Sequence, residues 1–415
     1  MKTNGLLKSA LACALALLCG VSAKAQTKAP GNLLDPAAFE TEIDGKKVSL
    51  YTITNGTIWA QVTNYAGYIV GIYTPDKNGS YDNVVGHNDS IQQYQGFSMN
   101  PCGAALGRFA NRIGNASFTL DGVKYELTRN NGQHILHGGA KGFDHSVFDV
   151  VSVTESAVVM SIDLADGLDG FPGNMKTIVT FSVTPDNGVS IDFKAAADKP
   201  TVCNLSHHVY FNLNGFAEPQ ILTHQISINS DKITEVDAGL IPTGKLLAVE
   251  NTPFDFRKAV TLGDRQVAAP AMPMGFGGPR PGAGGPRPGQ GAPQGGRPQG
   301  APQGGAPAAR PQMPPQQPVP DGMVRNYDMN FCLTHTVEGA IEPVATLYAP
   351  ESGRYMEVLN NQPGLQLYTG NRAGIAMESQ LYPDTPNHPE FPGNCGVLRP
   401  GDIYSHTVIY RFSVK

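Results

Sequence analysis

The residues best suited to chemistry lie in the segment TVCNLSHHVYFNLNG, positions 201–215. Side chains of a β-strand alternate between its two faces, so an extended segment here has one apolar face and one polar face. The polar face carries Asn204, Ser206, His208, Tyr210 and Asn212. A polar row of this kind lines a cleft or the mouth of a barrel. An edge strand with one solvent-exposed face is an equal alternative on spacing alone.

A second group of candidate residues lies in GRFANRIGNASFTLDG, positions 107–122. Arg108 and Arg112 are four residues apart and share a turn-rich context with Asn111. Guanidinium and amide donors suit ligands that are rich in hydroxyl groups or negatively charged. Either arginine is equally compatible with a structural role in holding a loop.

Three histidines follow, at positions 134, 137 and 145. The spacing of His134 and His137 is compatible with a zinc site that takes His208 as its third ligand. However, no carboxylate or cysteine pattern supports such a site, and the sequence HGG predicts a tight turn that presents His137. We therefore predict that no metal binds here.

The same alternation recurs in three strand-like segments near the C-terminus. It places Asp328, Gln366 and Glu378 each on a polar face whose opposite side is apolar. If these faces converge with the central segment, one cavity holds His137, His208, Asp328, Gln366 and Glu378, with Arg112 at its rim. Such a pocket would bind hydroxyl groups and leave one imidazole and one carboxylate for proton transfer.

Short strands punctuated by turns must position these groups. Extended runs of this kind begin near Lys47 and recur about every ten residues between Phe148 and Ala195, and again after Met329. Helical periodicity of useful length is absent beyond the first residues. Many short strands with regular turns predict an all-β protein, here a large antiparallel sandwich or barrel.

Positions 271–320 differ from the rest in composition, with 14 prolines, 13 glycines and no acidic residue in 50 positions. Such a segment cannot bury enough apolar surface to offset the entropy lost on ordering, so we expect disorder. We interpret it as a surface insertion into one architecture, although its proline-rich pieces could also bind a partner.

The first 25 residues have the pattern of an export signal. Lys2 and Lys8 precede an apolar run that ends near Val21, and Ala-Lys-Ala comes directly before Gln26. The run is too short to favour a membrane-spanning helix. We expect a periplasmic or secreted protein that begins at Gln26. Lipidation at Cys13 or Cys19 is a weaker alternative.

The remaining composition excludes several classes of protein. The chain of 415 residues has a formal charge of −5 and no basic stripe, which argues against a nucleic-acid partner. Cleavage would leave Cys102, Cys203, Cys332 and Cys395, too few and too scattered for a disulfide scaffold. We expect most of them to be buried thiols, with one disulfide left open.

Several segments together resemble the aldose 1-epimerase (galactose mutarotase) family. In chain order they are GRFANRIGNASFTLDG, NNGQHILHGG, NLSHHVYFNLNG, TPFDFR, YDMNFCL, QPGLQLYTGN, MESQLYPDTPNHPEFP and LRPGDIYSHTVIYRF. The resemblance runs from about position 36 to the end, apart from the insertion. It implies one β-supersandwich domain of the galactose mutarotase type over residues 26–415, as a monomer or weak dimer. It also implies interconversion of the α and β anomers of free aldohexoses such as glucose and galactose, without metal or organic cofactor.

The resemblance assigns roles position by position. His208 matches the general acid and Glu378 the general base. The positions that match or adjoin sugar-holding residues are Asn111, Arg112, His137, Tyr210, Asp328 and Gln366.

Two departures stand out. His207 replaces a commoner Asn and is expected to face the core, while Met329 stands where the family often has His and leaves the preferred epimer open. Two other activities also remain open. A glycoside hydrolase would use Asp328 and Glu378 as its two carboxylates, and a sugar-binding module would bind without catalysis.

Overall fold

The structure is a computed structural model that describes residues 28–95, 103–216, 220–267, 319–320, 322–370 and 374–415. Antiparallel strands are the main regular structure of this part of the chain, and its one α-helix is the short α2 (Ile91–Gln95). The all-β prediction is therefore confirmed. Within the described ranges, no helix is long and apolar enough to cross a membrane.

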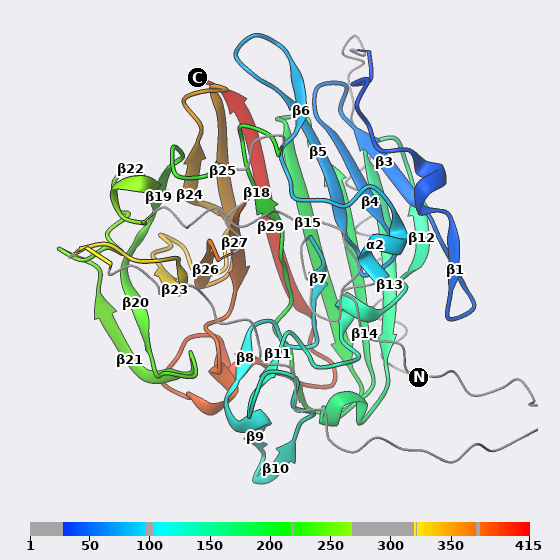
Figure 1. The fold of residues 1–415 in the computed structure, drawn as a ribbon. Helices are drawn as coiled ribbons and strands as arrows, with labels where there is room; N and C mark the ends of the chain where they lie inside the picture. Colours follow the sequence, from blue (N-terminus) through cyan, green and yellow to red (C-terminus); the bar gives the residue numbers. More distant parts are fainter. Residues whose placement is uncertain (1–27, 96–102, 217–219, 268–318, 321, 371–373) are drawn as a thin grey trace, which may run out of the picture.

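One layer of the molecule is a nine-stranded antiparallel sheet (Figure 1). Its strands, in spatial order, are β12 (Asp149–Val153), β13 (Ala157–Leu164), β14 (Met175–Val183), β15 (Gly188–Ala197), β29 (Tyr404–Val414), β25 (Arg354–Asn360), β24 (Glu342–Tyr348), β19 (Gln225–Ile228) and β22 (Val260–Thr261). The C-terminal strand β29 lies between β15 and β25, so it joins the first half of the chain to the second.

Two further sheets form the facing layer. The four-stranded sheet contains β3 (Leu50–Thr54), β4 (Trp59–Thr63), β5 (Ile69–Pro75) and β6 (Tyr81–Asn83), and its first two strands contact β13 and β14. The six-stranded sheet has the order β18 (Tyr210–Phe211), β27 (Ile375–Gln380), β26 (Gly364–Tyr368), β23 (Asp328–Leu333), β20 (Ser230–Val236) and β21 (Pro242–Ala248).

Five two-stranded ribbons complete the fold. They pair β1 (Thr41–Ile43) with β2 (Lys46–Val48), β7 (Ala105–Leu106) with β17 (Ser206–His207), β8 (Arg112–Ile113) with β11 (Ile135–Leu136), β9 (Ser117–Leu120) with β10 (Val123–Glu126), and β16 (Thr201–Val202) with β28 (Val397–Leu398).

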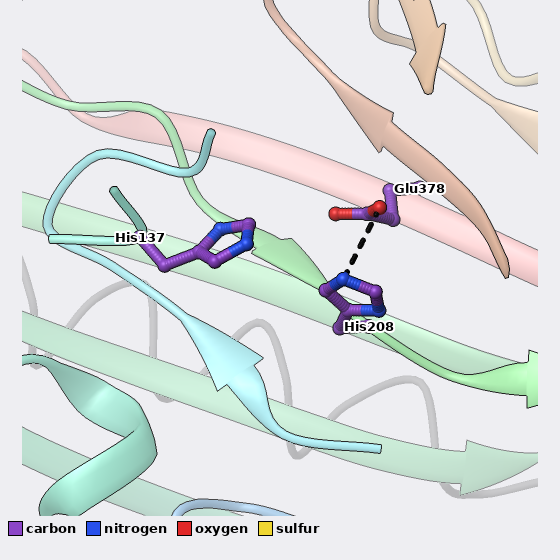
Figure 2. A group of neighbouring side chains, drawn as sticks. All are labelled: His137, His208 and Glu378. Atoms are coloured by element: carbon purple, nitrogen blue, oxygen red, sulfur yellow. Dashed lines mark ion pairs between the residues drawn. The ribbon is translucent and has the colours of Figure 1, made fainter. Parts of the chain in front are cut away.

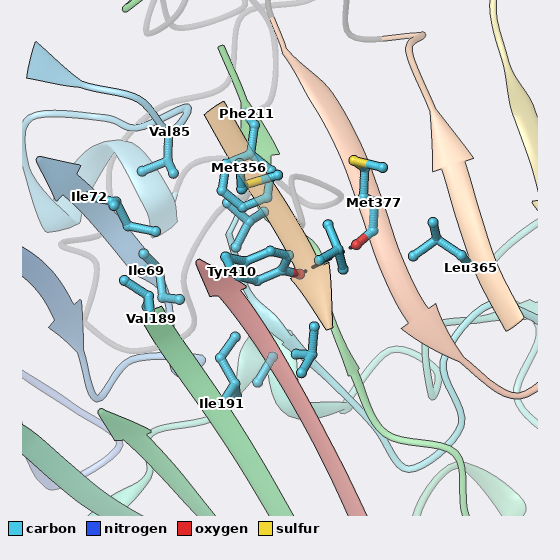
Figure 3. Packing of buried hydrophobic residues seen from close by; sticks show 14 of the residues in the cluster. Ile69, Ile72, Val85, Val189, Ile191, Phe211, Met356, Leu365, Met377 and Tyr410 are labelled. Atoms are coloured by element: carbon cyan, nitrogen blue, oxygen red, sulfur yellow. Dashed lines mark hydrogen bonds between the residues drawn. The ribbon is translucent and has the colours of Figure 1, made fainter. Parts of the chain in front are cut away.

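The main core fills the space between the layers (Figure 3). Met356 and Tyr410 of the nine-stranded sheet meet Leu365 and Met377 of the six-stranded sheet, and all four are almost fully buried. Burying one such side chain stabilises the fold by roughly 1.5–3 kcal/mol. Because Leu365 and Met377 lie on the faces predicted to be apolar, the opposite faces of their strands are free to carry polar groups.

The segment 201–215 is not one strand. It contributes β16, β17 and β18, which pair with three different partners, β28, β7 and β27. The prediction of a continuous strand was therefore wrong, because the chain changes partner twice as it passes between sheets. The alternation survives this change, since Leu205, Val209 and Phe211 all lie in the main core.

The alternative of an edge strand with a solvent-exposed face is also wrong. The polar row of this segment is buried, and each of its members is less than about one-tenth exposed. Asn204 and Ser206 bond neighbouring segments, the first through Ala110 and Leu381 and the second through the carbonyl of Ser379. His208 and Tyr210 of this row lie at the site described below.

The segments that flank the predicted insertion lie side by side. Gln266 and Val324 form a parallel bridge, and the amide of Val324 donates to the carbonyl of Arg265 at 2.8 Å. The Gln266 side chain accepts a hydrogen bond from Thr369, and the hydroxyl of Thr369 accepts one from the amide of Tyr327. The predicted export signal and Cys102 lie outside the described residues. So does the insertion, except for its last two residues, 319 and 320.

The described cysteines are all free thiols. Cys203 and Cys332 are buried, as expected, whereas Cys395 is partly exposed. Burial raises the pKa of the Cys332 thiol to about 11 and that of Cys203 further still. These two thiols are therefore protonated at neutral pH and suited to packing rather than to chemistry.

Candidate active site

Three neighbouring strands of the six-stranded sheet place the predicted polar groups in register. Gln366 of β26 lies directly opposite Asn330 of β23 on one side and opposite Glu378 of β27 on the other. The next row on the same face contains Asp328, Tyr368 and Ala376, and Ala376 pairs with Tyr210 of β18. Because directly opposed side chains point to the same face of a sheet, the predicted convergence is confirmed for this part of the site.

His208 and Glu378 form the centre of the site (Figure 2). Nε2 of His208 lies 3.4 Å from a carboxylate oxygen of Glu378, and both side chains are almost completely buried. The backbone of His208 is held on both sides, since its amide donates to Ala104 and its carbonyl accepts from Gly103. The ring stacks on Tyr210 with 4.8 Å between centroids. The imidazole therefore faces the carboxylate in a fixed orientation.

His137 reaches the same place from a tight turn after β11. Its own φ is 54° and Gly138 has a φ of 90°. A Cβ on Gly138 would lie 2.1 Å from the carbonyl oxygen of Gly107, so only glycine fits this turn. The His137 ring meets the His208 ring edge-on, with centroids 5.4 Å apart (Figure 2). The prediction that HGG presents His137 is confirmed.

A backbone bond fixes the tautomer of His137. The amide of Asn111 donates to Nδ1 of His137 at 3.2 Å, and the amide of His137 donates back to the Asn111 carbonyl. Nδ1 is thus an acceptor, and a neutral ring carries its proton on Nε2. Burial lowers the pKa of His137 well below its usual value, with further lowering by His208 and Arg112, although the side chain keeps some solvent exposure. His137 therefore offers the site a hydrogen-bond donor.

Ligand atoms of His137, His208 and Glu378 lie within 4.8 Å of one another, which is close enough to ask whether they suit a metal ion. A metal-bound histidine donates its second ring N–H to an acceptor. The second nitrogen of His137 does the reverse, because it accepts from Asn111. Binding a metal through Nε2 would require removing the proton that this bond places there. The geometry suits a hydroxyl group better than a cation.

Arg112 and Asp328 form the more open side of the site. The guanidinium of Arg112 lies 3.6 Å from the Asp328 carboxylate, which also accepts a hydrogen bond from Gln366 at 2.6 Å. The amide of Arg112 donates to the Asn111 side chain. Arg112 and Asp328 keep side-chain exposures of 12% and 22%, against 6% and 2% for His208 and Glu378. Their position at the rim matches the prediction for Arg112.

Arg108 does not belong to this site. Its buried guanidinium donates to the carbonyls of Pro172 and Gly173 and to the hydroxyl of Thr201. Arg108 therefore holds a loop, which was the alternative open to either arginine. His134 is also elsewhere, since its Nδ1 accepts from the amide of Asn115. The zinc site considered from the spacing of His134 and His137 is not formed.

Burial sets the protonation of the central pair. It raises the pKa of Glu378 well above its usual value; the charge of Asp328 adds to this rise, and Arg112 opposes it. Burial also lowers the pKa of His208 to about 3. Both shifts disfavour the charged forms. The uncharged pair, a carboxyl beside a neutral imidazole, holds the same number of protons as the ion pair, so a proton can move between the two without a change in net charge.

Three residues of the site were absent from the predicted set. Tyr368 lies edge-on to both His208 and Tyr210, at 6.1 Å in each case. Asn330 and Gln380 are buried on the same face, and their amide groups lack hydrogen-bond partners in the described structure. Alternation places all three on this face, but it does not show that they lie close to His208.

The two departures from the family motif lie away from the site. Met329 packs against the main core on the other face of β23, so it does not replace a sugar contact. His207 also faces the core, where its Nε2 lies 3.0 Å from the Gly67 carbonyl and its ring meets Phe181 edge-on. The expectation for His207 is confirmed.

Comparisons with known proteins agree with this geometry. The family model of aldose 1-epimerase matches residues 49–274 and 297–411, and its two matched ranges are separated within the predicted insertion. Galactose mutarotase from Bos taurus is 31% identical over 88% of this chain and 94% of its own length. Aldose 1-epimerase from Escherichia coli is 29% identical over 89% of this chain and 96% of its own length.

Solved structures support the fold. An aldose epimerase homologue from C. elegans has a TM-score of 0.71 and 24% identity, and the match covers 88% of this chain and 99% of that one. Galactose 1-epimerase from Lactobacillus acidophilus has a TM-score of 0.67 and 22% identity, and the match covers 90% of this chain and 97% of that one. The predicted supersandwich is thus confirmed, and the chain belongs to the aldose 1-epimerase family.

Proposed function

We propose that the protein is an aldose 1-epimerase, a mutarotase that interconverts the α and β anomers of free aldohexoses such as glucose and galactose. The observation that carries this proposal is the buried pair of His208 and Glu378, 3.4 Å apart. The pair lies beside groups suited to hydroxyl binding. Family membership supports the same conclusion.

An anomer interconverts by opening the ring, rotating about C1–C2, and closing on the other face of the aldehyde. Glu378 removes the proton of the C1 hydroxyl while His208 delivers a proton to the ring oxygen. Closure reverses both transfers. Each positioned acid or base of this kind contributes about 10²–10⁴ in rate. No covalent bond forms between the sugar and the protein.

The buried pair supplies the protons without a change in its charge. Before opening, Glu378 is ionised and His208 is protonated; in the open-chain stage Glu378 holds the proton and His208 is neutral. Burial favours the second arrangement, because it raises the pKa of Glu378 and lowers that of His208. A nearby carboxylate favours a protonated imidazole, and burial opposes that effect. The site thereby favours the protonation state of the open-chain stage.

The remaining groups hold the sugar. Arg112 offers guanidinium N–H donors, and His137 offers the Nε2–H that its bond with Asn111 selects. The Asp328 carboxylate is an acceptor, held by Arg112 and Gln366. A hydrolase would need Asp328 as a second acid or base. Its two fixed partners suit it to binding instead.

The sequence also supports an exported enzyme that begins at Gln26 and works in the periplasm or outside the cell as a monomer or weak dimer. N-terminal sequencing of the protein from its native host would show Gln26. Recovery of Met1 would contradict export with cleavage.

Polarimetry tests the proposed activity. Freshly dissolved α-glucose and α-galactose should reach equilibrium faster with the protein than in buffer alone. Glu378→Gln and His208→Asn should each lower kcat by about 10²–10⁴, and the double variant should lose far less than the product of the two effects, because the residues act in one exchange.

His207→Asn is the matched control, since His207 is adjacent but faces the core. It should retain activity. A parent protein that binds sugar without accelerating the rotation change would be a binding module. Release of reducing sugar from an oligosaccharide would indicate a hydrolase.

A further inference from the structure

Asp384 lies outside the reacting pair but is bonded to the segment that carries Arg112. Its amide donates to the carbonyl of Arg112 at 2.8 Å, and its Oδ1 accepts from the amide of Gly114 at 2.9 Å. The strand β8 is therefore held on both edges. On one side it pairs with β11, where Leu136 is opposite Arg112, and on the other side it meets Asp384.

The carboxylate of Asp384 is itself fixed. It is buried, Oδ1 also accepts from the side chain of Asn387 at 2.7 Å, and Oδ2 lies 3.4 Å from Nε2 of His388. A buried carboxylate with several partners has little freedom to move. The bond from its Oδ1 to Gly114, together with the bond from the Asp384 amide to the Arg112 carbonyl, thus defines where the backbone of β8 lies.

The same loop is tied to the catalytic strands. Asp384 follows Glu378 by six residues, beyond the end of β27. Between them, the amide of Leu381 donates to the side chain of Asn204, which in turn donates to the carbonyl of Ala110. Side-chain bonds therefore connect the segments that carry Arg112, His208 and Glu378.

From this geometry we infer that Asp384 is a positioning residue for Arg112: it holds the β8 backbone so that the guanidinium reaches Asp328 and the sugar. Asp384 makes no contact with the reacting pair among the described interactions. Its effect on the reaction passes through Arg112. This inference rests on the proposed function, because it concerns the sugar contact of Arg112.

A double-mutant cycle tests the inference. In the parent background, Asp384→Ala should raise KM by about tenfold or more with a smaller change in kcat, because a displacement of about 1 Å can alter rates up to about 10²-fold. In an Arg112→Ala background the same change should have almost no further effect on KM. The loss in Tm should be similar in both backgrounds, since the lost hydrogen bonds are the same.

Two more variants keep the test decisive if Asp384→Ala folds poorly. Asp384→Asn keeps an oxygen that can accept from the Gly114 amide. Its KM should therefore be close to that of the parent protein. Gly114→Ala would place a Cβ 3.1 Å from Oδ2 of Asp384 and 3.0 Å from Ile241. This change should push the Asp384 carboxylate away from β8 and raise KM several-fold, again only when Arg112 is present.

The outcomes separate the inference from the proposed function. Equal effects of Asp384→Ala on KM in both backgrounds would overturn the positioning role, as would an Asp384→Asn variant as impaired as Asp384→Ala. A parent protein with no mutarotase activity would instead overturn the proposed function. In that case, sugar affinity measured by calorimetry replaces KM in the same cycle.

Discussion

The buried histidine His224 allows the energetic effect of one protonation to be measured away from the active site. Its side chain is fully buried, Nδ1 lies 3.1 Å from the carbonyl of Ile221, and Nε2 lies 3.0 Å from the amide of Leu213. The carbonyl can only accept and the amide can only donate. The neutral ring with its proton on Nδ1 therefore satisfies both contacts, and a second proton on Nε2 would face an N–H group.

Burial lowers the pKa of His224 from 6.5 to about 4. A base with a depressed pKa in the folded state binds its proton more readily when unfolded. Its contribution to stability is therefore complete above pH 6.5 and is lost as the pH falls toward 4. At pH 5, which is about 1.5 units below the unfolded-state pKa of 6.5, the lost stability is about 2 kcal/mol, at 1.36 kcal/mol per unit. That is a large share of the roughly 5–15 kcal/mol that stabilises a typical domain.

His224→Gln supplies the comparison. A glutamine oxygen can still accept from Leu213 but does not titrate. Urea unfolding of parent and variant at pH 8, 7 and 5 gives the free energy of each. We expect the difference in free energy between parent and variant to change little between pH 8 and 7, because His224 of the parent is then mostly neutral in both the folded and the unfolded state. Between pH 7 and 5 the parent should lose about 2 kcal/mol more than the variant.

Other buried histidines titrate in both proteins and cancel in this difference. His207 and His406, whose pKa values burial lowers to about 4, are examples. If parent and variant lose the same free energy between pH 7 and 5, His224 does not resist protonation in the folded state, and the reasoning from its fixed donors and acceptors is wrong.

Three further predictions concern stability. Burial raises the pKa of Glu378, so its stabilising contribution is complete below pH 4.5 and is lost as the pH rises; Glu378→Gln should therefore gain thermal stability relative to the parent between pH 5 and 8, even as activity falls. Arg108→Met should destabilise the protein in urea by at least about 2 kcal/mol, since the carbonyls of Pro172 and Gly173 lose their donor; unchanged stability would mean that other donors replace it. Excising 271–320 with a short linker should leave kcat and Tm nearly unchanged, because closure entropy varies by only about 0.6 kcal/mol per doubling of length, and a many-fold loss of kcat at constant Tm would show that the segment acts on the site.

Sequence alternation located the site where the strands are regular. Asp328, Gln366 and Glu378 lie on three paired strands of ordinary geometry, so a period of two correctly places them on one face. The segment around His208 is different, because it changes partner twice within fifteen residues. Its faces were predictable from apolar spacing, but its division into short strands depends on contacts with β7, β27 and β28 that are distant in sequence.

Other features of the site depend on contacts that no local pattern contains. Arg108 and Arg112 share one turn-rich motif, and only the carbonyls of Pro172 and Gly173 show which one is structural. The protonation states of His208 and Glu378 also depend on contacts outside their own motifs. Reference pKa values suggest an ionised Glu378 and an imidazole that titrates near neutrality, whereas burial reverses the preference of both. Burial results from packing of the whole domain and is not visible in a motif.

The bridge between Gln266 and Val324 gives the protein a natural attachment point for a guest domain. A domain whose own termini lie close together can be spliced between two such neighbouring residues without stretching the host. The bridge is also near the sugar site, since Gln266 bonds Thr369, and Thr369 bonds Tyr327, the residue before Asp328. A guest that pulls its termini apart on binding its own ligand would strain these bonds first. Anomer exchange would then report the guest's ligand as a change in optical rotation.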